Sequence, residues 1–279
     1  MTDAKRFAIA RDVTRLRTVH RQRVERYGEQ APRPAFDKSE LSPHVHALAI
    51  QGFTQLLETE CESVVIAGWM SAALCRIGAP LDLVGAFGKV VEDEVRHVDL
   101  MCMMLEDLGI TPTAPLAPLP PSADVRPGSA ALEEVLCGLM GFFCIGEELS
   151  GHIFKAALEL AETPTAKWTV GEIFRDEATH GAFGFESARA LLGDIDAKAK
   201  ARVAERLQRE IAAFEKRLGG PLSGHGRSDF STDERALAKL GLLPREALLS
   251  IFYERLGTHV LPRLADVGLP LELRVKSSS

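Results

Sequence analysis

Residues 93–97 read DEVRH and residues 176–180 read DEATH, so the pattern Asp-Glu-x-x-His occurs twice in the chain. Positions three apart lie on one face of a helix, so the Glu and the His of each copy can bind the same metal ion. A further Glu lies upstream of each copy, in an apolar stretch with helical spacing. Two such halves predict a ligand set for two metal ions in the core of a helical bundle. The predicted ligands are Glu60, Glu94, His97, Glu147, Glu177 and His180.

A lone Glu-x-x-His on a surface helix is common and usually has no function, but both copies here lie among apolar residues. Val90, Val98 and Met101 share a helical face with the first copy, and Ile173 and Phe174 flank the second. A carboxylate on a buried face costs free energy unless it is paired or bound to a metal. The setting therefore favours a metal site over a polar core that only fixes the register of the helices.

Length and composition indicate an ordinary globular protein. The chain has 279 residues, of which 46% are hydrophobic and 26% charged, enough for one large domain spanning residues 1–279. The net charge of -6 argues against a general nucleic-acid binder. Met1–Arg26 is charged throughout, so no signal peptide is predicted, and no apolar run reaches the length that spans a membrane.

Cysteine usage predicts a cytoplasmic protein. The five cysteines form no CxxC pair and fall within apolar helical stretches, so we expect reduced thiols buried in the core. Thiolate ligation of the metals is not expected beside so many carboxylates. The five are Cys61, Cys75, Cys102, Cys137 and Cys144.

The spacing of apolar residues predicts an all-α fold with four long helices. The first two, over residues 44–77 and 82–108, are separated only by a short turn at 78–80 and must run antiparallel. Residues equidistant from such a turn face one another, which pairs Glu60 with Glu94. The third helix is expected over 129–161, and Thr163 with Pro164 makes a good start for the fourth.

The prolines of residues 111–127 exclude a helix there, and the length of this segment suits a crossover between two hairpins. Two antiparallel hairpins joined by one long crossover give the ferritin-like four-helix topology. The predicted bundle occupies residues 44–193. Residues 1–43 add an amphipathic basic helix (4–27) and a linker, and residues 194–279 add a C-terminal helical extension.

The C-terminal extension is predicted to begin with a charged helix over 194–218, followed by a glycine-rich loop at 219–231. Ser231 and Glu234 have the spacing of a capping box, in which each side chain accepts a hydrogen bond from the backbone of the other residue. Further helices are expected to about residue 261. Together with the N-terminal helix, this extension could cover the bundle and build a substrate pocket.

The two upstream ligands have adjacent rivals. Glu62 could replace Glu60, and Glu148 could replace Glu147, although both rivals lie on more polar helical faces. His44, His46 and His152 could line a pocket, but structural histidines are the commoner case. They are not counted among the ligands here.

With its two Asp-Glu-x-x-His motifs, the chain resembles the ferritin-like diiron-carboxylate superfamily over about residues 44–190. DEVRH is similar to the motif of its oxygen-activating members, which include bacterial multicomponent monooxygenases and the ribonucleotide reductase small subunit. The resemblance implies that Asp93 and Asp176 hydrogen-bond metal-bound histidines, often that of the other motif, with Arg96 as a further partner. Thr179 stands where the first motif has Arg96, so the surroundings of the two histidines are expected to differ.

The resemblance implies a non-haem diiron oxygenase or oxidase. Two iron ions, or manganese in one site, would use O2 as co-substrate to hydroxylate, N-oxygenate or desaturate a small organic molecule. An external electron donor and a homodimer are compatible with this function. The alternative is an iron-handling ferroxidase without an organic substrate. The residues beyond the four helices favour the first hypothesis, because they would obstruct the packing of subunits into a storage cage.

Overall fold

The structure is a computed structural model that describes residues 33–38, 41–113, 129–220 and 230–271. All regular elements in these ranges are helical, as predicted. None of the helices in the described ranges is long and apolar enough to cross a bilayer. The predicted helix at 4–27, most of the crossover and most of the glycine-rich loop lie outside the described residues. The elements are α2 (Pro43–Arg76), α3 (Leu81–Asp107), α4 (Ser129–Gly138), η2 (Leu139–Glu147), α5 (Glu148–Leu160), α6 (Pro164–Leu191), η3 (Leu192–Asp194), α7 (Ala197–Arg217), α8 (Thr232–Ala238), α9 (Arg245–Arg255), η4 (Leu256–Val260) and α10 (Leu261–Asp266).

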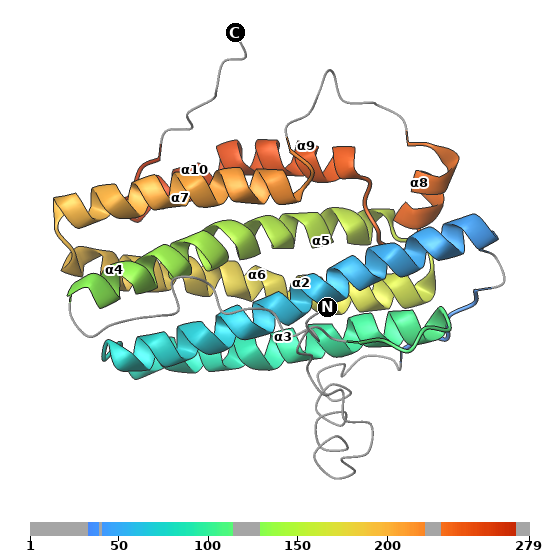
Figure 1. The fold of residues 1–279 in the computed structure, drawn as a ribbon, viewed down its shortest axis with the longest axis horizontal. Coiled ribbons are helices and arrows are strands. Elements are labelled where there is room, and N and C mark those ends of the chain that lie inside the picture. Colours follow the sequence, from blue (N-terminus) through green and yellow to red (C-terminus); the bar gives the residue numbers. More distant parts are fainter. Residues whose placement is uncertain (1–32, 39–40, 114–128, 221–229, 272–279) are drawn as a thin grey trace, which may run out of the picture.

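Helices α2 and α3 lie side by side along the molecule (Figure 1). The Ser42 side chain accepts a hydrogen bond from the Val45 backbone N–H and so caps the start of α2. The helix ends at Arg76, and Gly78 then takes a positive φ of 69°, which glycine adopts without strain. The chain reverses there and α3 begins directly after Pro80, so the two helices are antiparallel, and their ends match the predicted ends within one residue.

Helices α4, η2 and α5 form one continuous helical segment that packs against α6. The Thr163 side chain caps α6 by accepting from the Ala166 N–H, and Pro164 occupies the first turn, as predicted. The sequence predicted regular α-helix over 129–161, but residues 139–147 form a π-helix that ends on Glu147. Wider π turns are rare and occur often at functional sites. Apolar spacing does not reveal them, because their hydrogen-bond register is set by packing.

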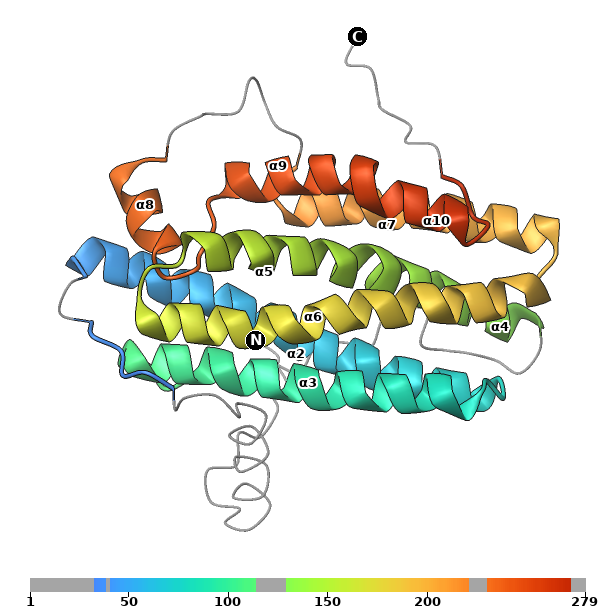
Figure 2. The ribbon, with the colours of Figure 1, turned by 180° about the vertical axis from the view of Figure 1, so that it is seen from behind.

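Helices α7, α9, η4 and α10 form an outer layer over α4, η2 and α5, and α8 packs against α2 (Figures 1 and 2). Val203 and Leu207 of α7 join the same apolar cluster as Phe143 of η2, as do residues of α9, η4 and α10. The capping box of Ser231 and Glu234 is confirmed at the start of α8. The last described helix ends at Asp266, five residues beyond the predicted end at about 261.

All five cysteines are free, and four of them are buried as predicted. The expectation is wrong for Cys75, which is exposed. Cys75 lies in the last turn of α2, beside the buried Leu74, where the helix leaves the core. An apolar stretch predicts a buried face on average, so a single position at a helix end can point outward.

The contact between α6 and η2 depends on a glycine. A Cβ at Gly184 would lie 2.8 Å from the carbonyl carbon and the Cβ of Phe143, and 3.0 Å from the backbone nitrogen of Cys144. Backbone cannot give way, so Gly184→Ala is expected to lower the free energy of unfolding by about 1–3 kcal/mol through overpacking. Gly171→Ala on the same helix is the control, since a Cβ there would lie 3.7 Å from Leu158 Cδ1, an ordinary contact. Alanine there should stabilise by up to about 1 kcal/mol. Urea unfolding of both variants measures the difference, and equal stabilities would contradict the close helix approach.

Candidate metal centre

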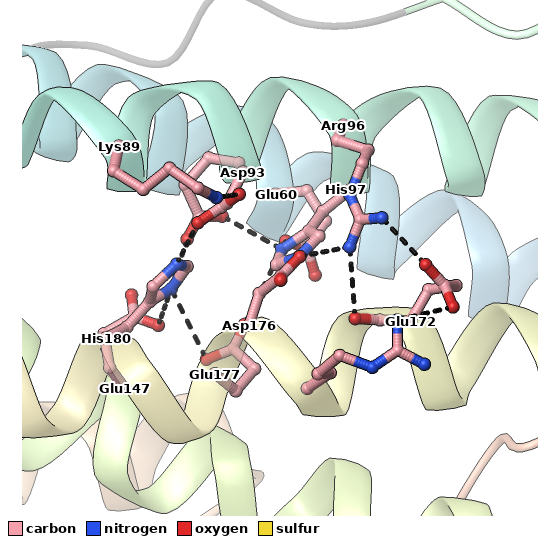
Figure 3. A network of polar contacts seen from close by, with 12 residues as sticks. Glu60, Lys89, Asp93, Arg96, His97, Glu147, Glu172, Asp176, Glu177 and His180 are labelled. Atoms are coloured by element: carbon pink, nitrogen blue, oxygen red, sulfur yellow. Dashed lines mark hydrogen bonds and ion pairs between the residues drawn. The ribbon is translucent and has the colours of Figure 1, made fainter. Parts of the chain in front are cut away.

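The structure brings the six predicted ligand residues together between the helices. Figure 3 labels all of them except Glu94. Glu60 comes from α2, Glu94 and His97 from α3, and the others from η2 and α6. All six are buried, and the two histidines have no exposed surface. Four helical segments thus contribute Glu, Glu-x-x-His, Glu and Glu-x-x-His. Their role as ligands stays a prediction.

The six residues form two groups, and within each group the candidate ligand atoms lie within 4.8 Å of one another. In the first group, His97 Nδ1 is 3.5 Å from Glu60 Oε2 and 3.5 Å from Glu94 Oε2. In the second, His180 Nδ1 is 3.0 Å from Glu94 Oε1 and 3.5 Å from Glu147 Oε2. Glu94 therefore offers one oxygen to each group.

Glu177 has a similar position between the histidines. Its Oε1 is 3.7 Å from His97 Nδ1, and its Oε2 is 4.0 Å from His180 Nδ1. Two carboxylates that each face both histidines are suited to bridge a pair of ions. Glu60 and Glu147 each face one histidine only, so they are suited to bind one ion each.

Several polar atoms facing this space are buried without hydrogen bonds to any other described residue. They include both carboxylate oxygens of Glu94, Oε2 of Glu177, and Nδ1 of His97 and of His180. Buried polar atoms are normally satisfied, so such a cluster calls for an ion or for protons. Imidazole and carboxylate donors together suit iron, manganese or zinc. The residues present fit a pair of metal ions.

The outer nitrogens of the two histidines are held by aspartates in a crossed arrangement. His97 Nε2 lies 3.2 Å from Asp176 Oδ2, and His180 Nε2 lies 3.2 Å from Asp93 Oδ2. Each Asp thus contacts the histidine of the other motif, as the resemblance implied. An Asp that accepts from Nε2–H fixes the tautomer, so that the Nδ1 lone pair points into the centre.

The two aspartates have different cationic partners, as the difference between Arg96 and Thr179 predicted. Arg96 is buried and donates to Asp176 and, at 2.8 Å, to Glu172 Oε2. Asp93 is instead paired with Lys89, whose side chain is partly exposed. Neither Glu172 nor Lys89 was identified from the sequence. Lys89 lies four residues before Asp93, a spacing that favours an ion pair and could have identified it, whereas Glu172 meets Arg96 of another helix.

Burial and mutual repulsion shift the ionisation of this cluster. Burial raises the pKa of Glu60 to about 7, and burial with the neighbouring Glu147 raises the pKa of Glu177. Although burial opposes it, the contacts of Glu94 with His180 and His97 lower its pKa to about 2. Burial would lower the pKa of both histidines, but their carboxylate partners raise it. Without metal, bound protons supply part of the positive charge that the ions would otherwise provide.

Metal binding should therefore release protons, because ions bind the deprotonated ligands. Glu60 holds its proton below its raised pKa of about 7, so metal affinity should fall as the pH decreases from 8 to 6. We expect more protons released per ion at pH 6 than at pH 8. Titration with Mn2+ in weakly buffered indicator solution measures this release, and Glu60→Gln should reduce it at pH 6. Equal release at both pH values would contradict the assignment.

The rival residues lie outside the centre. Glu62 is half-exposed and is 3.6 Å from Arg217, while Glu148 is turned toward the outer helix layer. His46 contacts the Leu108 carbonyl at 2.9 Å, as expected for a structural histidine, and His44 is an exposed side chain near Asp233. These positions favour Glu60 and Glu147 as ligands.

Comparison with known proteins does not add to this geometry. No protein-family model matches this chain, and a search of curated proteins returns no match. The fold and the candidate metal centre therefore rest on the sequence and the structure of this chain alone.

Proposed function

We propose that the chain is a ferritin-like diiron oxygenase or oxidase that uses O2 to oxidise a small organic molecule. The observation that carries this proposal is the crossed pairing of Asp93 with His180 and of Asp176 with His97 around two shared carboxylates. In this pairing, an aspartate of one helix fixes the orientation of the imidazole on the other helix. The antiparallel pair α2 and α3, together with the pair of α4–α5 and α6, supports the ferritin-like topology.

The ligand set supports redox chemistry better than structural metal binding. The four carboxylates and two imidazoles offer at most ten donor atoms, five for each ion, so an ion that takes six ligands keeps a position open for an exogenous molecule. When bound, two ferrous ions would supply electrons for the reduction of dioxygen. The chain itself holds the imidazoles in one tautomer and keeps the carboxylates buried from water. The Arg96 guanidinium pairs with Asp176 and Glu172, and so offsets one negative charge beside His97.

The experiment is to expose the diferrous protein to 18O2 with and without a panel of small organic compounds. We expect O2 consumption that one class of compound accelerates, with a hydroxylated, N-oxygenated or desaturated product detected by mass spectrometry. Asp176→Asn should slow product formation by roughly 10- to 100-fold, because it disturbs the group that orients His97. Growth of a ferric mineral with many irons per chain, unaffected by any compound, would contradict the oxygenase and leave the ferroxidase.

A further inference from the structure

A second cluster of metal-binding side chains lies between the bundle and its outer layer. It consists of Glu148 and His152 of α5 and His259 of η4. Glu148 Oε1 is 3.3 Å from His259 Nε2 and 4.0 Å from His152 Nε2. Two ligand atoms of one tetrahedral zinc ion lie about 3.4 Å apart, given bonds of about 2.0–2.1 Å. The three groups are therefore close to a ligating arrangement.

We propose that Glu148, His152 and His259 bind a single divalent transition-metal ion such as Zn2+, at a site separate from the carboxylate-rich centre. Two histidines and one carboxylate are a donor set for zinc or ferrous iron with positions left open. The two imidazole rings stand edge to face with centroids 4.9 Å apart, so both nitrogens can approach one ion beside the carboxylate.

The His152 side chain has a ring nitrogen that is available to bind a metal ion. Its Nε2 atom is buried and makes no hydrogen bond within the described part of the chain. Burial lowers the pKa of His152, and the neighbouring His259 and Arg255 lower it further. The ring is therefore neutral at physiological pH and keeps a lone pair for a metal. A buried imidazole nitrogen without a partner is costly unless an ion or water meets it.

The Glu148 carboxylate is held in place by its other oxygen. Arg263 of α10 donates to Glu148 Oε2 and lies over the ring of Phe185, with its guanidinium carbon 3.9 Å from the centroid. A Cβ at Gly181 would lie 2.5 Å from the same oxygen, so the absence of a side chain there makes room for the carboxylate. These contacts direct Oε1 toward the two histidines. Hydrogen bonding of a ligating carboxylate by an outer group is usual in metal sites.

The proposed ion would connect two layers of the fold. Glu148 follows directly after Glu147, the candidate ligand at the end of the π-helix, while His259 belongs to the outer layer. An ion bound by both elements joins the outer layer to the helical segment that supports the metal centre. We expect Zn2+ to raise the melting temperature partly through this link, because it binds the folded chain only.

The test counts Zn2+ by equilibrium dialysis of the full chain and of His259→Gln. His259 is about half exposed, so the variant should fold normally. We expect one fewer Zn2+ per chain in His259→Gln and a smaller rise in melting temperature. His44→Gln is the matched control, since it removes an exposed histidine elsewhere and should bind the same number as the unaltered chain.

The difference of one ion is expected whether or not the carboxylate-rich centre is filled, so this test does not depend on the proposed oxidase function. Crystals grown with ZnCl2 provide the second measurement. Anomalous diffraction at the zinc edge should show a peak bonded to Glu148 Oε1 and both imidazoles. Equal Zn2+ counts in His259→Gln and the unaltered chain, or the lack of this peak, would overturn the proposal.

Discussion

The double variant Glu94→Ala, Glu177→Ala is expected to lose the two metal ions of the carboxylate-rich centre. These two carboxylates each face both His97 and His180, so their removal takes a ligand from each ion. The remaining Glu and His on each side cannot compete with a chelator. Metal analysis after dialysis against EDTA measures the loss.

Loss of metal in this variant should not reflect unfolding. Burial and repulsion from Glu147 raise the pKa of Glu177, so in the metal-free protein alanine there removes a protonated side chain and no ion pair. Glu94→Ala does remove a carboxylate that contacts both histidines, so folding has to be measured beside metal content. Helical content by circular dichroism should stay unchanged. Glu62→Ala is the control, because Glu62 is half-exposed and pairs with Arg217 away from the centre. If the double variant keeps its full metal content, the ligand assignment is wrong.

Arg96→Leu is expected to cost about 3–5 kcal/mol of folding stability in the metal-free protein, because it leaves buried carboxylates without their partner. Arg96 donates to both Asp176 and Glu172, and it also reaches the Glu172 carbonyl at 3.3 Å. Leucine supplies similar apolar bulk but no donor. Urea unfolding in the presence of EDTA separates this effect from the loss of metal.

Lys89→Met is the matching variant beside His180, and its loss of stability is compared with that of Arg96→Leu. Lys89 pairs with Asp93 as Arg96 pairs with Asp176, but its side chain is 38% exposed, so water can replace it. The cost should be smaller than that of Arg96→Leu, because Lys89 is partly exposed although Asp93 is buried. A similar loss of stability in both variants would contradict the asymmetry between the two halves of the centre.

The position of the centre was predictable because helical spacing alone places Glu94 with His97 and Glu177 with His180. The choice of Glu60 over Glu62 followed from the apolar face, and the structure places Glu60 inside and Glu62 at the surface. The crossed aspartates came from the family resemblance instead. Spacing within one helix does not say which residue of another helix a side chain will meet.

Other features depend on packing that the sequence does not display. The π-helix before Glu147 changes the register of one turn without changing the apolar pattern. The cluster of Glu148, His152 and His259 joins residues more than a hundred positions apart, and only the folded outer layer brings His259 to α5. In the sequence, His152 was one of several histidines best explained as structural.

The buried carboxylates and histidines are expected to hold two metal ions side by side. Anomalous diffraction at the iron edge, from crystals of protein produced in iron-rich medium, would locate them. We expect two peaks about 3.5–4 Å apart, as in other two-metal sites, one bonded to His97 Nδ1 and the other to His180 Nδ1, with Glu94 bound to both. Iron bonded to Glu62 or Glu148 in place of Glu60 or Glu147, or no iron between the two histidines, would contradict this expectation.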